Sequence, residues 1–387
     1  MSNIYYAPTK LYIGAEEERV GEIISSYGYK NVLFVYGKSS IKLSGLYDKV
    51  ISSLKKSSLN VIEAFGVEPN PKVDFIRNVL DKNYDIDFIL AVGGGSVIDT
   101  AKSIAVSYKK NIDPWEFNAK TKEATSALPI GVILTIPAAG SEMSNSCVIS
   151  NPKIQAKNGF NSDLVRPLFS IMNPMNCITL PKYQTACGIV DIMMHTLERF
   201  ITKEVSELSD NFSIALLKTV YKYGIITYND PTNLEARREI MLASSFSHNG
   251  LMELGRSMCF RCHQFEHVLS AVHDNIAHGA GLAVVWLAYA KYIYKNEIAF
   301  PKFLRLAYEV FDVTPTNDKE NDCYLGILKL EEYFKKLGMP SKMADLGITL
   351  DELEDLSLKV SWNKTRTIND VIPLTYKEMK EIYKLMY

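Results

Sequence analysis

Short apolar runs recur through the first half of the chain, separated by stretches with helical spacing. The runs lie at residues 31–37, 60–66, 88–95, 130–137 and 169–174. Between the first three runs, residues 45–58 and 73–84 place apolar side chains three and four positions apart, as in amphipathic helices. Short strands that alternate with helices are typical of a parallel sheet with helices on both faces. We therefore predict an α/β N-terminal domain with a Rossmann-like parallel sheet over residues 1–180.

The pattern changes after residue 180, where strand-like runs become almost absent. Apolar residues at three- and four-residue intervals instead fill the stretches 183–202, 209–228, 234–254 and 328–339. This periodicity indicates helices that bury one face. We therefore predict an all-α C-terminal domain over residues 181–387, and a chain of 387 residues also favours two domains over one.

Composition and charge exclude several classes of protein. Lysine and arginine number 43 against 44 aspartates and glutamates, so we expect neither a nucleic-acid partner nor a membrane partner. The N-terminal residues lack the pattern of a signal peptide, and the longest apolar run, 281–290, is too short to span a bilayer. We therefore expect a cytoplasmic protein. Cys259 and Cys262 form a CxxC pair without a second such pair, which we interpret as structural or incidental.

A run of glycines ends the apolar stretch 88–95. Gly93, Gly94, Gly95 and Ser96 stand where a buried strand is expected to stop and a helix to start. Glycine lets the backbone turn sharply, and the first turn of a helix offers N–H groups and a positive dipole end to an anion. The run therefore predicts a pyrophosphate site, with a tight strand-to-helix turn as the alternative. Its spacing fits neither the GxGxxG fingerprint nor the P-loop.

A second candidate nucleotide contact follows the run 31–37. In dinucleotide-binding sheets, an acidic side chain at this place commonly binds the hydroxyls of the adenosine ribose. This chain offers Gly37, Lys38 and Ser39 there instead. A lysine and a hydroxyl tolerate or attract a 2′-phosphate, so the sequence favours NADP(H) over NAD(H). The alternative is that Lys38 is a solvated loop residue.

Asp191 and His195 lie four residues apart among apolar neighbours, which places both on one buried face of a helix. A buried carboxylate without a partner is costly, and a divalent cation would compensate its charge. Four of the six histidines then fall in one short stretch, at positions 263, 267, 273 and 278. One aspartate with three imidazoles suits Fe(II), Zn(II), Co(II) or Mn(II). A buried Asp–His network without a metal is the alternative.

Together these motifs resemble the iron-containing (metal-dependent) alcohol dehydrogenase family, and in particular its butanol dehydrogenase branch. The resemblance covers nearly the whole chain and depends on the segments 68–71 (EPNP), 91–105 (AVGGGSVIDTAKSIA), 136–151 (IPAAGSEMSNSCVISN), 180–198 (LPKYQTACGIVDIMMHTLE), 243–256 and 263–283. It implies a dehydroquinate synthase-like architecture, with the nucleotide in the α/β domain and the metal in the helical domain. It also implies a homodimer that reduces small aldehydes reversibly to primary alcohols with NAD(P)H at Fe(II), with Zn(II) possible.

The resemblance implies roles for individual residues. The metal ligands would be Asp191, His195, His263 and His278, with His273 as the alternative to His278 if the register is shifted. The catalytic side chains would be His267, as a proton relay, and the ligand His263. Beyond Gly93–Ser96, the cofactor contacts would be Asn70, Asp99, Thr135, Ser141 and Lys157.

Two other functions stay open. One is a lyase of the dehydroquinate synthase kind, which would need several basic residues in its pocket; the motifs of the helical half supply few. The other is a non-catalytic metal or nucleotide sensor. Met193, Met194 and Phe265 predict an apolar substrate pocket, which favours the aldehyde reductase. The chain departs from the family at Ala139, where threonine is common, and at Asn173, where an acidic residue is usual.

Overall fold

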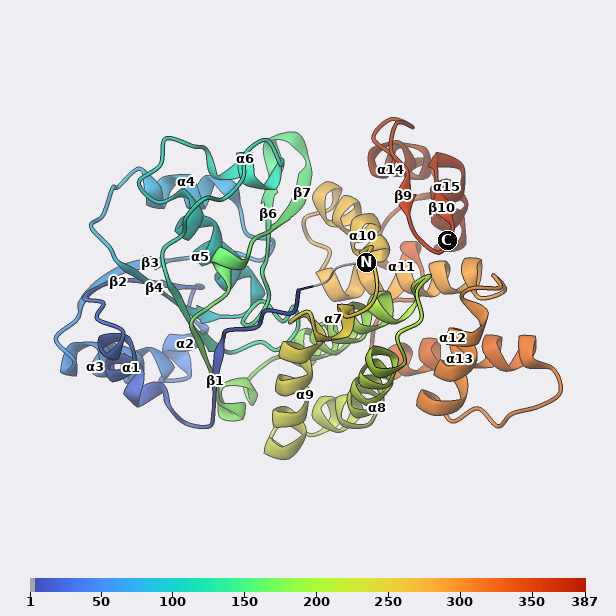
Figure 1. The fold of residues 1–387 in the computed structure, drawn as a ribbon, viewed down its shortest axis with the longest axis horizontal. Coiled ribbons are helices and arrows are strands. Elements are labelled where there is room, and N and C mark those ends of the chain that lie inside the picture. The colour runs from blue at the N-terminus through green and yellow to red at the C-terminus, as the bar shows by residue number, and fades with distance from the viewer. Residues whose placement is uncertain (1–3) are drawn as a thin grey trace. The chain divides into compact units, whose positions relative to one another are not determined.

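A six-stranded parallel sheet forms the centre of the first half of the chain (Figure 1). The computed structural model describes residues 4–387, so residues 1–3 of the expected N-terminal domain lie outside the description. In spatial order the strands are β1 (Lys10–Ile13), β8 (Phe169–Met172), β5 (Ile130–Leu134), β4 (Phe88–Gly93), β2 (Asn31–Tyr36) and β3 (Asn60–Phe65). All except β1 coincide with the predicted apolar runs, and all neighbours pair in parallel. The predicted parallel sheet is confirmed.

The sheet is buried because successive side chains enter two different apolar cores. In β2, Leu33 belongs to one core and Phe34 to the other, as the two-residue period of a strand requires. Figure 1 shows helices on both sides of the sheet. They are α1 (Val20–Ser26), α2 (Ser40–Leu43), α3 (Leu46–Lys56), α4 (Val73–Leu80), α5 (Gly95–Ser107) and α6 (Pro114–Asn118). With both faces covered, the carboxyl ends of the strands are where a ligand site is expected.

The sequence did not predict every element of this half. The strands β6 (Ser146–Asn151) and β7 (Ala156–Asn161) pair as an antiparallel hairpin. Polar residues interrupt both strands, so neither shows the alternation that predicts a strand. The short edge strand β1 shows no such alternation either, because none of its residues is fully buried.

The chain divides into two compact units. The sheet unit comprises Tyr6–Leu180 and Pro231–Asn249; the helical unit comprises Pro181–Asp230 and Gly250–Tyr387, with Ile4 and Tyr5. The first boundary between the units falls at residue 180. Helix α9 (Leu234–Ser247) nevertheless belongs to the sheet unit, so a single boundary at residue 180 does not describe both units. Hydroxyls of α9 explain this placement, because Ser245 Oγ donates to the buried carboxylate of Glu142 (2.7 Å).

The helical unit matches the all-α expectation apart from a minimal antiparallel pair, β9 (Ile368–Asn369) and β10 (Pro373–Leu374). Its helices are α7 (Lys182–Phe200), α8 (Glu207–Asn229), α10 (Arg261–Val272), α11 (His278–Ile293), α12 (Phe300–Arg305), α13 (Lys319–Lys336), α14 (Leu353–Val360) and α15 (Tyr376–Leu385). Helix α11 packs against both α7 and α10. This packing brings segments far apart in sequence to one place.

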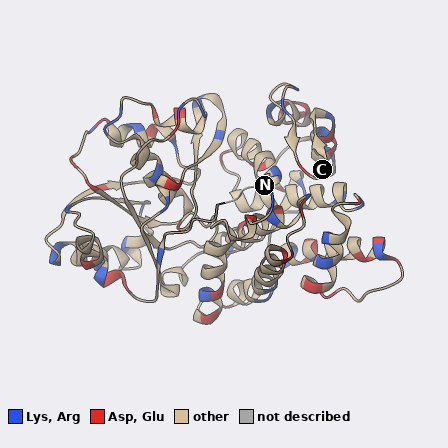
Figure 2. Cartoon of the chain, viewed as in Figure 1, with Lys and Arg blue, Asp and Glu red and all other residues tan. Residues whose placement is uncertain are grey.

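Charge and hydropathy in the structure agree with the balanced composition. Figure 2 shows positive and negative side chains interspersed along the helices in this view rather than gathered by sign. Among residues 4–387, no helix combines the length and the apolar character needed to cross a bilayer.

Candidate metal centre and nucleotide site

Helix α7 carries the predicted Asp191–His195 pair into the interior of the helical unit. From Ile189 to Phe200 every residue of the helix is buried, so this half has no solvated face. A helix that is enclosed on all sides is a core element. Asp191 and His195 are each 3% exposed, which means that their polar atoms must find partners inside the protein.

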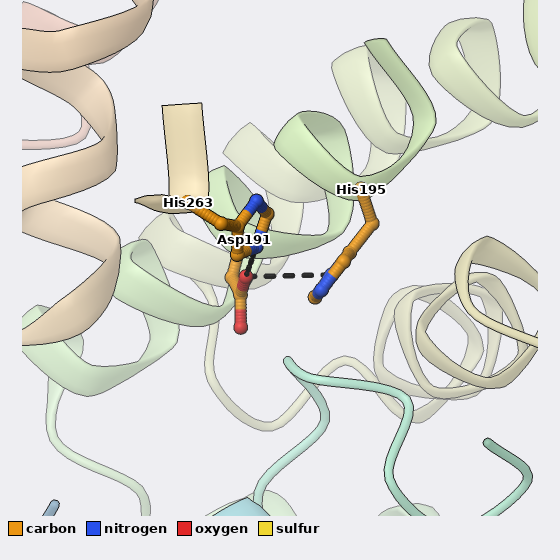
Figure 3. Close-up of side chains that lie close together, drawn as sticks. All are labelled: Asp191, His195 and His263. Atoms are coloured by element: carbon orange, nitrogen blue, oxygen red, sulfur yellow. Dashed lines mark ion pairs between the residues drawn. The ribbon is translucent and has the colours of Figure 1, made fainter. Parts of the chain in front are cut away.

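Three imidazoles from three helices converge on one carboxylate oxygen. Oδ1 of Asp191 lies 3.3 Å from Nδ1 of His195 and 3.5 Å from Nε2 of His263 (Figure 3). Nε2 of His278 lies 3.8 Å from the same oxygen. His195 shares α7 with Asp191, whereas His263 belongs to α10 and His278 is the first residue of α11. The structure therefore brings together all four side chains that the sequence predicted as ligands.

The ligand atoms of Asp191, His195 and His263 all lie within 4.8 Å of one another, as expected for ligands of a single small cation, and His278 approaches the aspartate oxygen of this group. Four ligand atoms placed tetrahedrally at about 2.1 Å from a metal lie about 3.4 Å from one another. The three nitrogens are 3.3, 3.5 and 3.8 Å from the aspartate oxygen. Within the described chain, Oδ1 of Asp191 and Nε2 of His263 are buried and make no hydrogen bond. A cation would satisfy both atoms, and a set of one oxygen and three nitrogens suits Fe(II) or Zn(II).

The electrostatics of His263 point the same way. Burial lowers the pKa of its imidazole, but the neighbouring carboxylates of Glu198 and Asp191 outweigh this effect and raise the pKa to about 9. The site thus attracts positive charge at neutral pH. A cation that binds there must displace this proton, because only a neutral imidazole can be a metal ligand.

Two carboxylates that sequence reasoning missed are hydrogen-bonded to the predicted ligands His263 and His278. Glu198 on α7 is hydrogen-bonded to Nδ1 of His263, and Glu266 on α10 is hydrogen-bonded to Nδ1 of His278. Both glutamates are fully buried. The signal in the sequence was helical spacing, since Glu198 lies seven residues after Asp191 and therefore on the same face of α7.

The glycines after His278 allow the three helices to approach closely. A Cβ at Gly279 would lie 2.2 Å from the carbonyl oxygen of Cys187, one turn before Asp191 on α7. A Cβ at Gly281 would lie 2.8 Å from Cγ of Glu266 on α10. Real side chains do not approach that closely. The "HGAG" segment is therefore a packing requirement as well as the start of α11.

The other predicted side chains lie around this centre. His267 is half-buried, with its ring centroid 5.7 Å from that of His278 and 6.4 Å from that of His263. His273 faces away from Asp191, because its Nε2 contacts Oε2 of Glu352 (2.7 Å).

The predicted apolar pocket takes a different form in the structure. Met193, Met194 and Phe265 are core residues, each at most 1% exposed, so they are poorly placed to meet a substrate. An aromatic ring does lie beside the predicted ligands, that of half-buried Phe260, with its centroid 5.9 Å from the ring of His195 and 5.1 Å from that of His263. The sequence pattern could not show which phenylalanine lies beside the histidines. Phe260 shortly precedes His263 and Phe265 shortly follows it, so both are close to this histidine in sequence.

The glycine run of the sheet unit forms the expected strand-to-helix junction. Strand β4 ends at Gly93 and α5 begins at Gly95. A Cβ at Gly94 would lie 2.7 Å from Cβ of Ile136, so the loop after β5 closes on the glycines. Thr135 belongs to that loop, and its N–H donates to the carbonyl of Gly93 (3.0 Å). The first N–H groups of α5 are directed toward the carboxyl edge of the sheet, as a phosphate site requires.

The remaining cofactor candidates form two hydrogen-bonded pairs in the same unit. Ser141 Oγ donates to Oδ1 of Asp99 (2.5 Å), and the Lys157 ammonium donates to Oδ1 of Asn70 (3.1 Å). Oδ2 of Asp99 also accepts from the backbone N–H of Val148 (2.9 Å), so this aspartate fixes the start of the β6–β7 hairpin. Burial raises the pKa of Asp99.

The Gly37–Ser39 segment follows the carboxyl end of β2, at the same edge of the sheet as the glycine run. The Lys38 ammonium forms an ion pair with Oε1 of Glu68 (2.8 Å). Both side chains are more than half exposed, so the pair is open to solvent and to a ligand. Lys38 is therefore a solvent-exposed lysine that carries one surface ion pair.

Comparison with known families accounts for nearly the whole chain. The sequence model described as "Iron-containing alcohol dehydrogenase" matches residues 8–174. The model described as "Fe-containing alcohol dehydrogenase family, C-terminal" matches residues 185–387.

Individual relatives cover the same length. The chain is 38% identical to NADH-dependent butanol dehydrogenase A of Clostridium acetobutylicum, over 99% of both chains. It is 33% identical to the NADPH-dependent aldehyde reductase YqhD of Escherichia coli, over 91% of both. A crystal structure of NADH-dependent butanol dehydrogenase A from Thermotoga maritima superposes with a TM-score of 0.94 at 33% identity, covering 100% of this chain and 98% of that one. A crystal structure of YqhD from Escherichia coli K-12 superposes with a TM-score of 0.93 at 30% identity, covering 100% of this chain and 99% of that one. Both structures support the expected dehydroquinate synthase-like architecture.

Proposed function

Since the chain belongs to the iron-containing alcohol dehydrogenase family, we propose that it reduces small aldehydes to primary alcohols at the Asp191 centre with NADPH. The chain is an NAD(P)H-linked alcohol dehydrogenase or aldehyde reductase, as its relatives support. The observation that carries the proposal is the approach of three imidazole nitrogens to one oxygen of Asp191. The proposed assembly is a homodimer.

Each group of residues has a defined task in this proposal. Asp191, His195, His263 and His278 would hold a divalent cation, which when bound would supply the Lewis acidity that stabilises negative charge on the substrate oxygen. Gly93–Ser96 bind the pyrophosphate of the cofactor, and hydride transfer is the chemistry that the nicotinamide supplies. His267, half-buried beside His278, passes a proton to the product oxygen, since an imidazole both donates and accepts protons near neutral pH.

Lys38 supports NADP(H) as the preferred cofactor. A lysine at the end of β2 can pair with a 2′-phosphate, whereas Glu68 competes for the same ammonium group. We expect Lys38→Ala to lower the ratio of kcat/KM for NADPH to kcat/KM for NADH by about 10-fold or more. This change corresponds to the loss of one charge-assisted hydrogen bond, which contributes about 1.5–3 kcal/mol. Glu68→Gln should raise that ratio because it releases Lys38. An unchanged ratio in both variants would show that Lys38 does not read the phosphate.

The lyase alternative finds little support in the helical unit. A phosphorylated and carboxylated substrate would need several basic side chains, but the buried arginines here are already engaged. Arg199 pairs with Glu253 (2.7 Å), Arg256 with Asp210 (2.7 Å) and Arg261 with Asp370 (2.5 Å). Breaking such buried pairs to bind a substrate would cost several kcal/mol, of the order of 3–5 per pair.

The direct test is aldehyde-dependent oxidation of NADPH. We expect butanal to support turnover by protein loaded anaerobically with Fe(II) or with Zn(II), and metal-stripped protein to be inactive until reloaded. Glycerol should be a poor substrate in the oxidative direction. A strong preference for glycerol would contradict the small-aldehyde assignment. Binding of NADPH and metal without any turnover would indicate a sensor.

A further inference from the structure

The proposed ligands His263 and His278 are each hydrogen-bonded through Nδ1 to a buried glutamate, and neither glutamate has a role in the proposed reaction. Each ring points one nitrogen, Nε2, at Asp191 and the other, Nδ1, at a glutamate. The two glutamates come from different helices, Glu198 from α7 and Glu266 from α10. His195 is held differently, since its ring lies edge-on to Phe260.

The hydrogen bonds of Nδ1 determine which nitrogen can bind a cation. A carboxylate only accepts, so Nδ1 must carry the proton and Nε2 of the neutral ring must present its lone pair. The carboxylate also fixes the rotation of the ring, which keeps Nε2 directed at the centre. Glu198 is itself held in place, because its Oε1 accepts from the backbone N–H of Cys262 (2.6 Å).

The hydrogen bond between Glu266 and Nδ1 of His278 requires a glycine at position 281. Glu266 and Gly281 face each other where α10 packs on α11. A methyl group at position 281 would lie 2.8 Å from Cγ of Glu266 and 3.3 Å from its Oε1. Because Cγ is near the base of the side chain, Glu266 could yield only by moving its carboxylate away from His278.

We infer that Glu198 and Glu266 are positioning residues that set the affinity of the Asp191 centre for its cation, and that Gly281 allows Glu266 to reach His278. The inference rests on the proposed function, in that Asp191 and the three histidines must be the ligands. It adds two buried carboxylates and one glycine that never touch the cation. Outer partners of ligating histidines commonly contribute 10–100-fold in metal affinity.

The test is a titration of metal-stripped protein with Zn(II) in competition with a chromophoric chelator. We expect Glu198→Ala and Glu266→Ala each to raise the dissociation constant about 10–100-fold. Glu198→Gln keeps an acceptor for Nδ1 and should lose less than about tenfold by the same reasoning. The absorption spectrum of Co(II)-loaded protein should change in both alanine variants, since ring orientation sets the ligand field.

Asp322 provides a matched control in the same unit. It is fully buried and accepts hydrogen bonds from Tyr308 Oη (2.7 Å) and Thr316 N (2.8 Å), but contacts no histidine in the described structure. Asp322→Asn should lower stability and leave the Zn(II) affinity within twofold of wild type. If it weakens binding as much as Glu266→Ala does, the glutamates act through general stability and the inference fails.

A double-mutant cycle tests the role of Gly281. Gly281→Ala should weaken Zn(II) binding, and the double variant Gly281→Ala with Glu266→Ala should bind no more weakly than Glu266→Ala alone, because both changes remove one bond. Additive losses would overturn the link between these residues. If an alanine variant does not fold, Glu198→Gln and Gly281→Ala decide the question.

The outcomes also separate this inference from the proposed function. If wild type binds Zn(II), Asp191→Ala does not, and all glutamate variants bind within twofold of wild type, only the positioning role is wrong. If wild type binds no Zn(II), the proposed function fails with it.

Discussion

Replacing Asp191 with alanine should remove the bound metal and lower kcat/KM for butanal with NADPH by at least about 1000-fold, because a bound cation contributes several kcal/mol to stabilising charge in the transition state. Oδ1 of Asp191 is the atom on which the three imidazoles converge, so its loss removes the only anionic member of the ligand set. Metal content by elemental analysis and initial rates of NADPH oxidation measure the two effects separately.

Asp191→Asn is the companion variant. It keeps the shape of the side chain and one oxygen but not the negative charge, so we expect most of the activity loss without a packing defect. Circular dichroism and denaturant titration of both variants establish that the fold is retained. Full activity in either variant, with metal still bound, would contradict the assignment of Asp191 as a ligand.

Replacing His278 with alanine should weaken metal binding by more than about 100-fold, since a direct ligand must contribute more than the 10–100-fold of an outer partner. Nε2 of His278 lies 3.8 Å from the oxygen of Asp191, within the range expected for two ligands of one cation. Activity should fall in parallel with metal occupancy and recover in part at high Fe(II) or Zn(II) concentrations.

His273→Ala is the internal control for this prediction. His273 precedes His278 by one short loop but pairs with Glu352 at the surface instead. Loss of a half-exposed pair of this kind costs about 0–1 kcal/mol of stability, and metal affinity should not change. If His273→Ala loses the metal and His278→Ala keeps it, the register of the ligands is shifted and the centre described here is wrong.

The sequence by itself determined five of the six strands of the parallel sheet and the local half of the candidate metal site. The apolar runs of β2, β4, β5 and β8 predicted the parallel sheet, because strands buried on both faces are apolar throughout, and the run of the partly exposed edge strand β3 extended it. The spacing of Asp191 and His195 placed both on one helix face, because helical geometry over four residues depends only on the local backbone. Local patterns of this kind need no knowledge of distant segments.

The spacing of the clustered histidines did not decide which of them meet Asp191; the family resemblance implied His263 and His278, and the tertiary structure brings these two to the carboxylate. His263, His267, His273 and His278 look alike in sequence, but packing of α10 and α11 against α7 turns His263 and His278 toward the carboxylate and His273 toward Glu352. The same packing revealed Glu198 and Glu266, and hydroxyl contacts to Glu142 placed α9 in the sheet unit. Periodicity describes one helix at a time, whereas these contacts depend on how closely separate helices approach, which here is set by Gly279 and Gly281.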